Sequence, residues 1–342
     1  MNPIELESSF DYTTLRGEPE TIQNKFKEII SRAPRNNEWT SFIELFQYQG
    51  FWHSPSFLEG TILAQEEFQP HPNEIILCSA PKAGTTWLKA LAFSILTRSK
   101  NTLNNLEPNP LLSSTPHECV PFLEVDLFQK KQTQYPQIPL IATHLPYVSL
   151  PKSITTNSTC RIVYISRDPK DVVVSMWHFI GNIKTCKNNE ESAIFPLERA
   201  VELFCEGISK NGPYWDHVLG YWKASLEQPD RVLFLKYENL KSDTKVWVKR
   251  LAEFMGFPFS SEEVIEDAIQ KVVDLCSFEN LSNLEVNKNA EFNLFSTVKV
   301  KNNKYFRKGE VGDWKTCLSE EDRKKIDRIS EEKLKDSGLT FG

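Results

Sequence analysis

The chain has 342 residues, of which 40% are apolar and 25% are charged, values that are ordinary for a folded globular protein. Its formal net charge of −6 argues against a protein that coats nucleic acid, so a site for an anionic ligand must be a local cluster of basic groups. No apolar run approaches the ~18 residues that suggest a membrane span, and Met1–Phe10 has no signal-like core. Seven cysteines without a CxxC pair favour reduced thiols. We therefore expect a cytoplasmic protein that binds neither nucleic acid nor membrane.

The N-terminal residues are polar and charged, which favours a loose segment over residues 1–15 and a helix near Glu20–Ile30. The rest of the chain contains neither an internal repeat nor a low-complexity linker. Residues 16–342 are therefore predicted to form a single domain.

Four short apolar runs predict buried strands at Glu74–Ala80, Ile138–His144, Arg161–Arg167 and Arg231–Tyr237. Helical patterns follow most of them, at Thr85–Arg98, Lys170–Ile180 and Ser242–Met255. Apolar strands that alternate with helices predict an α/β fold with a central parallel sheet flanked by helices. Towards the C-terminus, the polar stretch Glu285–Lys304 is expected to be a long loop. The capping-box-like start of Ser319–Lys335 predicts a surface helix.

A P-loop-like segment carries the strongest functional signal. The first predicted strand runs into Pro81-Lys-Ala-Gly-Thr-Thr-Trp87, after which a helix begins at once. Such a strand–loop–helix directs backbone N–H groups and a helix N-terminus at one point, which suits a phosphate. Gly84 allows close backbone approach, the two threonine hydroxyls are donors, and Lys82 adds a positive charge. It is not a Walker A loop, because the lysine precedes the glycine.

Two further basic segments are compatible with a phosphate site, although taken alone Arg167 is more typical of a salt bridge and the Arg307–Gly309 segment of a solvated basic turn. Arg167 ends a predicted strand, and Ser175 lies eight residues further on, in the next helix. The planar guanidinium of arginine binds phosphate oxygens bidentately. Far along the chain, Arg307 and Lys308 place two cations beside Gly309, which is also an anion-binding arrangement.

A candidate general base follows the second predicted strand. His144 lies at its C-terminal end, before Pro146, and ligands of open parallel sheets bind at that edge. The unperturbed pKa of histidine, ~6.5, suits general-base catalysis. His178 is the rival, because it lies one helical turn past Ser175, but its neighbours Trp177 and Phe179 favour a packing role.

These segments resemble motifs of the plant cytosolic sulfotransferases, flavonol sulfotransferase-like enzymes in particular: P-K-x-G-T-T-W-L, R-[ND]-P-K-D-x-x-V-S, R-K-G-x-x-G-D-W-K and T-H-x-P. The resemblance covers most of the chain. It implies a metal-free enzyme that moves the sulfuryl group of 3′-phosphoadenylyl sulfate (PAPS) onto a hydroxyl of a small organic acceptor.

The resemblance also implies a role for each matching residue. His144 would be the base, Lys82 would stabilise the leaving phosphate, and Trp87 would stack on adenine. Many members have Ser or Thr where this chain has Ala83. The other implied PAPS-binding residues are Ala83, Gly84, Thr85 and Thr86 at the 5′-phosphosulfate; Arg167, Ser175, Arg307, Lys308 and Gly309 at the 3′-phosphate; and Tyr237, Cys276, Ser277 and Phe278 near the nucleotide.

The acceptor is predicted less directly. The resemblance favours a flavonoid or other phenolic, and candidate aromatic residues for its pocket are Phe51, Trp52, Tyr147, Phe179, Tyr214 and Trp215. Hydroxyjasmonate is the runner-up, with Lys184 as the candidate cation for its carboxylate, and a steroid is a third choice. The animal dimer motif K-x-x-x-T-V-x-x-x-E keeps only its lysine, Lys315, so we expect a monomer.

Two other functions fit parts of the pattern. A nucleotide-dependent kinase could use the same strand–loop–helix, but it would need Mg²⁺ and a carboxylate ligand, and the apolar strands offer no clear aspartate. A nucleotide-binding protein without chemistry is the other alternative, and the presence of both Lys82 and His144 argues against it.

Overall fold

The structure is a computed structural model that describes residues 19–39, 44–103, 109–126, 138–156, 159–181, 184–185, 195–295 and 298–341. The segment 1–15, predicted to be loose, lies outside these residues. The helix expected near Glu20–Ile30 is α1 (Pro19–Arg32).

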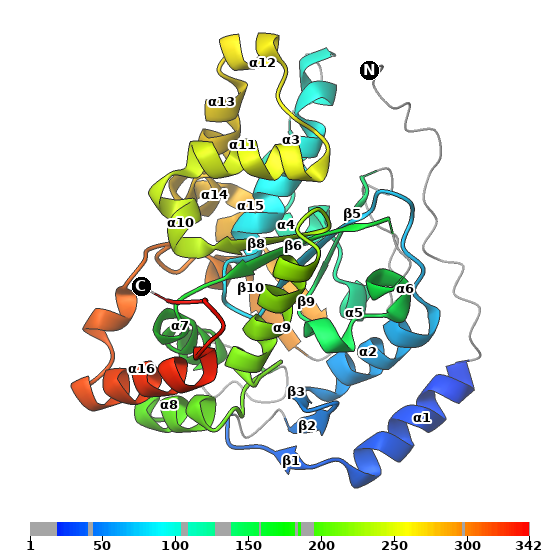
Figure 1. The fold of residues 1–342 in the computed structure, drawn as a ribbon, viewed down its shortest axis with the longest axis vertical. Helices are drawn as coiled ribbons and strands as arrows, with labels where there is room; N and C mark the ends of the chain where they lie inside the picture. Colours follow the sequence, from blue (N-terminus) through cyan, green and yellow to red (C-terminus); the bar gives the residue numbers. More distant parts are fainter. Residues whose placement is uncertain are drawn as a thin grey trace.

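A four-stranded parallel sheet forms the centre of the fold, as the sequence predicts (Figure 1). Its strands stand in the order β5 (Leu140–Thr143), β4 (Ile75–Ser79), β6 (Arg161–Ser166) and β8 (Val232–Lys236). The chain goes from β4 to one neighbour, β5, and then crosses to the other neighbour, β6. The C-terminal end of β4 is therefore a topological switch point, where open α/β sheets bind their ligands.

Helices cover both faces of this sheet, because successive side chains of a strand point to opposite faces. In β4, Ile76 and Cys78 belong to one core cluster, whereas Ile75 and Leu77 belong to the other. The first cluster is closed by α7 (Pro169–Gly181), α8 (Leu197–Cys205), α9 (Tyr214–Glu227) and α16 (Glu320–Leu334). The second is closed by α3 (Thr85–Leu103), α10 (Tyr237–Ser242), α11 (Thr244–Met255), α13 (Ala268–Leu275) and α14 (Phe278–Asn283). The single α/β domain is thus confirmed.

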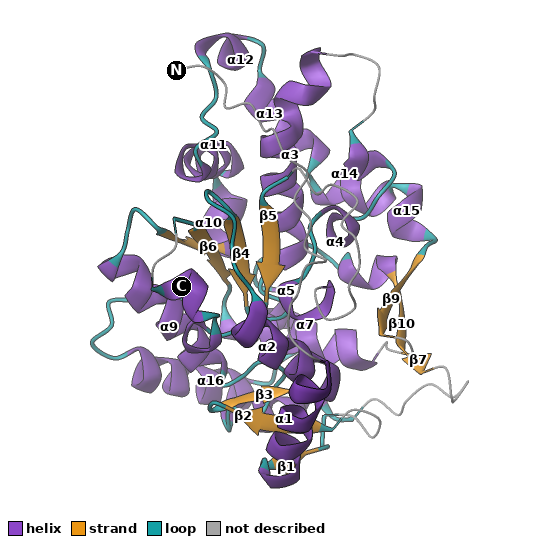
Figure 2. Cartoon of the chain, turned by 90° about the vertical axis from the view of Figure 1, so that its right-hand side faces the viewer, coloured by secondary structure: helices purple, strands orange, loops and turns teal. Residues whose placement is uncertain are grey.

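Two small antiparallel sheets flank this core (Figure 2). One consists of β1 (Arg35–Asn36), β2 (Leu45–Tyr48) and β3 (Phe51–His53), and α2 (Pro55–Glu67) follows it directly. The other consists of β7 (Lys184–Thr185), β10 (Val298–Lys301) and β9 (Glu291–Phe295). The shorter elements are α4 (Pro116–Cys119), α5 (Leu123–Asp126), α6 (Lys152–Thr155), α12 (Ser261–Ile265), α15 (Glu285–Lys288), η1 (Pro110–Leu112), η2 (Tyr147–Ser149), η3 (Asn302–Tyr305) and η4 (Asp313–Thr316).

The prediction of a long loop over Glu285–Lys304 is wrong. This stretch contains α15, the antiparallel pair of β9 and β10, and most of η3. Its polar composition concealed the strands, because a two-stranded ladder is held by backbone hydrogen bonds, which polar residues form as well as apolar ones.

Among the residues that the structure describes, no helix has the length and apolar character needed to cross a lipid bilayer. The six cysteines in this part of the chain are free thiols.

Candidate functional site

A pocket of about 360 Å³ lies at the switch point, a volume typical of small-molecule sites. It gathers segments that are far apart in the sequence, including the β4–α3 loop, the start of α14 and the stretch 305–310. All but one of the predicted site residues line it: Lys82, Gly84, Thr85, Thr86, Trp87, His144, Arg167, Ser175, Tyr237, Cys276, Ser277, Phe278, Arg307, Lys308 and Gly309.

The exception is Ala83. Its side chain is fully buried, and its N–H donates to the carbonyl of Ala80 at 3.2 Å. The structure therefore places Ala83 in the support of the turn and not in the pocket wall. The small side chain that departs from the Ser or Thr of many relatives packs into the core.

The β4–α3 loop takes its shape from two left-handed backbone positions. Gly84 has φ +115°, and a Cβ there would lie 2.8 Å from the ring of Tyr237, so only glycine fits. Lys82 has φ +69°, a conformation that is uncommon for a residue with a side chain and that is often retained at functional sites. The loop ends where α3 begins, and there Thr85 Oγ1 bonds Ser79 Oγ at 2.6 Å.

Lys82 contributes an uncompensated positive charge. Its Nζ lies 4.0 Å from the centre of the Phe179 ring and 5.8 Å from that of Tyr305. Burial, together with the nearby positive charges of Arg307 and Arg167, lowers the pKa of Lys82 to about 7. No carboxylate in the described part of the chain forms an ion pair with it. An anion that enters the pocket would therefore stabilise the protonated lysine.

Arg167 is held by both its backbone and its guanidinium. Its N–H donates to the Tyr214 hydroxyl at 3.2 Å, and its Nη2 donates to the Glu310 carbonyl at 2.6 Å. The guanidinium also lies 3.3 Å from Asp171 and 4.6 Å from the centre of the Tyr237 ring. Its Nε is buried and has no hydrogen-bond partner among the described residues. A buried donor of this kind is an expected feature of a site built for an anion.

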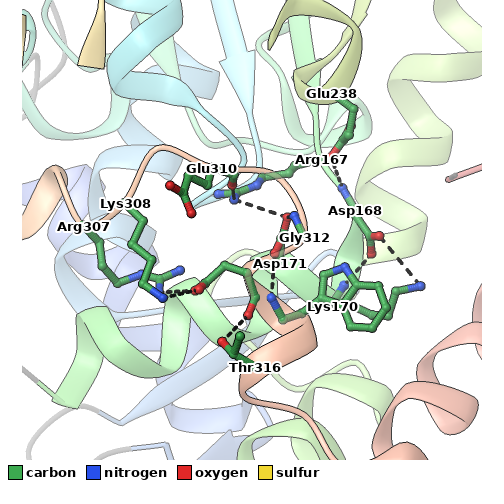
Figure 3. Close-up of polar contacts among 12 residues, drawn as sticks. Arg167, Asp168, Lys170, Asp171, Glu238, Arg307, Lys308, Glu310, Gly312 and Thr316 are labelled. Carbon is green, nitrogen blue, oxygen red and sulfur yellow. Dashed lines mark hydrogen bonds and ion pairs between the residues drawn. The ribbon is translucent and has the colours of Figure 1, made fainter. Parts of the chain in front are cut away.

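Buried carboxylates hold the segment 307–314, one within the segment and one that joins it to α7 (Figure 3). Arg307 and Lys308 both donate to Asp313. Asp171 of α7 accepts from the backbone N–H of Gly312 at 2.8 Å and of Trp314 at 3.1 Å. Because Asp171 also faces Arg167, one carboxylate joins two parts of the predicted 3′-phosphate clamp.

Aromatic rings close the side of the pocket where the nucleotide is predicted to bind. Trp87 meets Tyr237 edge to face, with ring centres 5.4 Å apart. Gly309 has φ +66° and packs so closely on Phe278 that a Cβ would lie 2.4 Å from that ring. The segment of residues 276–278 therefore contacts the basic segment of residues 307–309, and both were predicted to bind the nucleotide.

His144 is fixed in one tautomer. Its Nδ1 lies 2.8 Å from the carbonyl oxygen of Ser79, and a carbonyl can only accept, so Nδ1 carries the proton and Nε2 keeps a free lone pair. Its backbone N–H donates to Glu124 at 2.7 Å, and its carbonyl accepts from His217 at 3.0 Å. Burial holds the pKa of His144 well below its usual 6.5. The ring is therefore neutral at neutral pH, as a general base requires.

The structure changes the choice among the remaining histidines. His178 borders a separate hollow beside Lys82 and packs against Trp177, with ring centres 4.6 Å apart and the rings tilted by 59°. His117, which sequence reasoning passed over, lines the main pocket, and its Nε2 lies 3.1 Å from Thr86 Oγ1. No local sequence signal marks His117, because it reaches the pocket from the short helix α4.

Most of the aromatic residues predicted for the acceptor pocket lie elsewhere, and Phe179 is the one that lines it. Tyr214 hydrogen-bonds the backbone of Arg167, and Trp215 donates to Ser330 of α16 at 2.9 Å. Tyr147 packs edge-on against Tyr221. The other two, Phe51 and Trp52, are core residues of β3. The side chain of Lys184 lies outside the described residues.

Other side chains that sequence reasoning missed also line the pocket, away from the predicted phosphate ligands. They come from the segment that leads into β2, from the starts of α2 and α5 and from the loop before α9, and most are apolar. The set is Trp39, Leu45, Ser54, Phe57, Phe122, Val125 and Lys210. Their sequence separation explains why no motif identified them.

The switch-point pocket, with its phosphate-type loop, clustered cations and neutral histidine, is that of a nucleotide-dependent transferase. Residues 72–338 match the family described as "Sulfotransferase domain". A flavonol sulfotransferase-like protein of Flaveria bidentis is 48% identical over 316 residues, which cover 92% of this chain and 99% of that protein. The flavonol 4′-sulfotransferase of Flaveria chlorifolia is 47% identical over 94% of this chain and 99% of its own.

Solved structures agree with these relatives. A putative steroid sulphotransferase of Arabidopsis thaliana has a TM-score of 0.72 at 37% identity, covering 95% of this chain and 98% of that one. A mouse sulfotransferase complexed with PAP has a TM-score of 0.62 at 26% identity, covering 86% and 95%. The chain belongs to the sulfotransferase family, and the prediction of a PAPS-dependent sulfotransferase is confirmed.

Proposed function

We propose that this enzyme transfers the sulfuryl group of PAPS to a phenolic hydroxyl of a flavonol, with His144 as the base and Lys82 at the leaving phosphate. The observation that carries this proposal is the tautomer of His144. Its Nδ1 is engaged by the Ser79 carbonyl, which leaves Nε2 to accept a proton in the pocket that Lys82 also lines.

The chemistry follows from these positions. Nε2 of His144 takes the proton of the acceptor hydroxyl while the hydroxyl oxygen forms a bond to the sulfur of PAPS. The bond between sulfur and the 5′-phosphate oxygen breaks, and that oxygen leaves with the electron pair as part of PAP. Lys82 stabilises the charge that grows on the phosphate, and Thr85 and Thr86 orient its oxygens. Catalysis is then mainly positioning and preorganised electrostatics, as in phosphoryl transfer.

The 3′-phosphate of PAPS is assigned to Arg167, Ser175, Arg307, Lys308 and Gly309, which line one pocket despite their separation in sequence. Arg167→Ala should lower the affinity for PAPS about tenfold to a hundredfold, because a charge-assisted bidentate contact is lost. Adenosine 5′-phosphosulfate, which lacks the 3′-phosphate, should be affected much less. Equilibrium binding of both ligands to wild type and variant checks this, and equal weakening of the two would show that the clamp is misplaced.

A flavonol acceptor is supported by the similarity to flavonol sulfotransferases and by the rings of Trp39, Phe57 and Phe122 in the pocket wall. A phenol also suits a histidine base, because its pKa of ~10 is closer to that of imidazole than the pKa of an aliphatic alcohol.

The acceptor is tested by comparing kcat/KM for a flavonol, a hydroxyjasmonate and a hydroxysteroid at one PAPS concentration. We expect the flavonol to be the fastest. A flavonol slower than either of the others by about tenfold, or roughly 1.4 kcal/mol in transition-state binding, would overturn the choice of acceptor and leave the reaction type intact.

We further propose that the reaction needs no metal, that the enzyme is a monomer and that it is cytoplasmic. The cations of Lys82, Arg167 and Arg307 supply the charge that Mg²⁺ supplies in kinases. Three or more metal-ligating side chains do not cluster anywhere in the described ranges. Arabidopsis relatives are named cytosolic sulfotransferases, which supports the location.

A further inference from the structure

Lys210 places a further positive charge in the pocket, on the side proposed for the acceptor and away from the predicted phosphate ligands. It lies in the loop between α8 and α9, and its Nζ is 3.5 Å from the centre of the Phe57 ring. Within the described part of the chain it has neither a hydrogen bond nor an ion pair. The carboxylate whose charge acts on it, Glu124, is already engaged by the His144 N–H and the Thr143 hydroxyl. Burial lowers the pKa of Lys210 to about 7, so an anionic partner would stabilise its charged form.

The loop that carries Lys210 is held in place from both sides. The N–H of Asn211 donates to the Trp52 carbonyl at 2.7 Å, and the N–H of Trp52 donates to the Gly212 carbonyl at 2.9 Å. The indole of Trp39 donates to the Ile208 carbonyl at 2.5 Å. A cation on a loop fixed to β3 in this way is preorganised, which reduces the entropy lost when a ligand binds.

Ser54 lies on the same wall of the pocket and has an unused hydroxyl. The residue is only 6% exposed, and its Oγ has no hydrogen-bond partner among the described residues. Ser54 is the N-cap residue of α2, yet its side chain makes no capping hydrogen bond. Phe57, the residue beneath Lys210, belongs to the first turn of the same helix. The N-terminus of a helix favours negative charge, so hydroxyl, helix end and ammonium group suit the same kind of ligand.

We propose that Lys210, Ser54 and the N-terminus of α2 form a subsite for an anionic group carried by the acceptor, a carboxylate or a sulfate ester. The aromatic rings of the wall hold the flat body of the acceptor, while Lys210 and Ser54 donate hydrogen bonds to its anionic oxygens. The subsite rests on the proposed function, and it narrows the acceptor to a phenol that already bears a negative charge. It also replaces Lys184 as the cation expected to face an acceptor carboxylate.

The test compares kcat/KM for a flavonol, the same flavonol with one carboxylate, and the same flavonol with one sulfate ester. Wild type should prefer at least one anionic acceptor over the parent by about tenfold or more. Lys210→Met should reduce that preference about tenfold to a hundredfold, the usual weight of a charge-assisted hydrogen bond. Ser54→Ala should reduce it severalfold, and Lys210→Arg, which keeps the charge, should retain most of it.

The ratio of kcat/KM between an anionic acceptor and the parent flavonol separates a loss of recognition from a loss of structure, because a misfolded variant would lose activity on all three acceptors together. An unchanged ratio in Lys210→Met, or a wild type without any anionic preference, would overturn the subsite. If Lys210→Met does not fold, an unchanged kcat/KM ratio in Ser54→Ala would likewise overturn the subsite. Failure of wild type to transfer sulfate to any of the three would instead contradict the proposed function. Which anionic acceptor is preferred identifies the carboxylate or the sulfate ester as the ligand.

Discussion

His144→Ala is expected to lower kcat by roughly 10²–10⁴, the usual contribution of a positioned general base. The affinity for PAPS should change little, because the ring of His144 bonds the Ser79 carbonyl and the proposed phosphate ligands lie on other segments. Rapid-quench measurement of sulfate ester formation, with PAPS binding measured separately, distinguishes the two effects. The expected result is a slow enzyme that still binds its donor.

His178→Ala is the matched control, since His178 borders the neighbouring hollow and packs against Trp177. It should keep most of the wild-type kcat. Near-normal turnover in His144→Ala would contradict the assignment of His144 as the general base. A loss in His178→Ala as large as that in His144→Ala would move the role to that residue.

Lys82→Met should lower kcat by roughly 10²–10³, the cost of removing one preorganised group that stabilises developing charge. Methionine keeps the length and apolar contacts of the side chain beside Phe179 while removing the charge. Because the stabilised charge develops on the leaving phosphate, the KM of the acceptor should change little. A variant that raises the acceptor KM and keeps kcat would place Lys82 in acceptor binding and contradict the assignment.

The pKa of Lys82 adds a second readout. Since burial lowers it to about 7, the free enzyme loses this charge as the pH rises through about 7, and kcat/KM for PAPS should fall in that window. The pKa of His144 is lowered well below 6.5, so a loss on the acid side should begin only well below that pH. Lys82→Arg, which stays protonated, should remove the fall at high pH, and an unchanged profile in that variant would exclude Lys82 as its source.

That the residues proposed for the nucleotide line one pocket could be predicted from sequence, because they belong to local motifs. In the β4–α3 loop, spacing alone brings Lys82, Gly84 and the start of a helix together. The placement of Arg167 at a strand end is equally local, since β6 ends one residue before it. The register of the parallel strands then brings these ends to the same edge of the sheet.

The part of the pocket proposed for the acceptor could not be predicted in this way, because its residues meet only through tertiary packing. Trp39, Ser54 and Lys210 belong to separate segments, joined where the residue 208–212 loop bonds β3. Residue type was a poor guide as well. Tyr214 is aromatic and close in sequence to Lys210, yet it does not line the pocket. Its hydroxyl instead accepts a hydrogen bond from the backbone N–H of Arg167.

The central claim is tested most directly by following the sulfuryl group itself. The enzyme is incubated with PAPS labelled in that group and with a flavonol, in the presence of EDTA, and both the ester and PAP are quantified. The account predicts that the label moves to the flavonol and that one PAP forms for each sulfate ester, at the same rate with and without added Mg²⁺. Release of the label as free sulfate without any labelled flavonol, or turnover only with Mg²⁺, would contradict it.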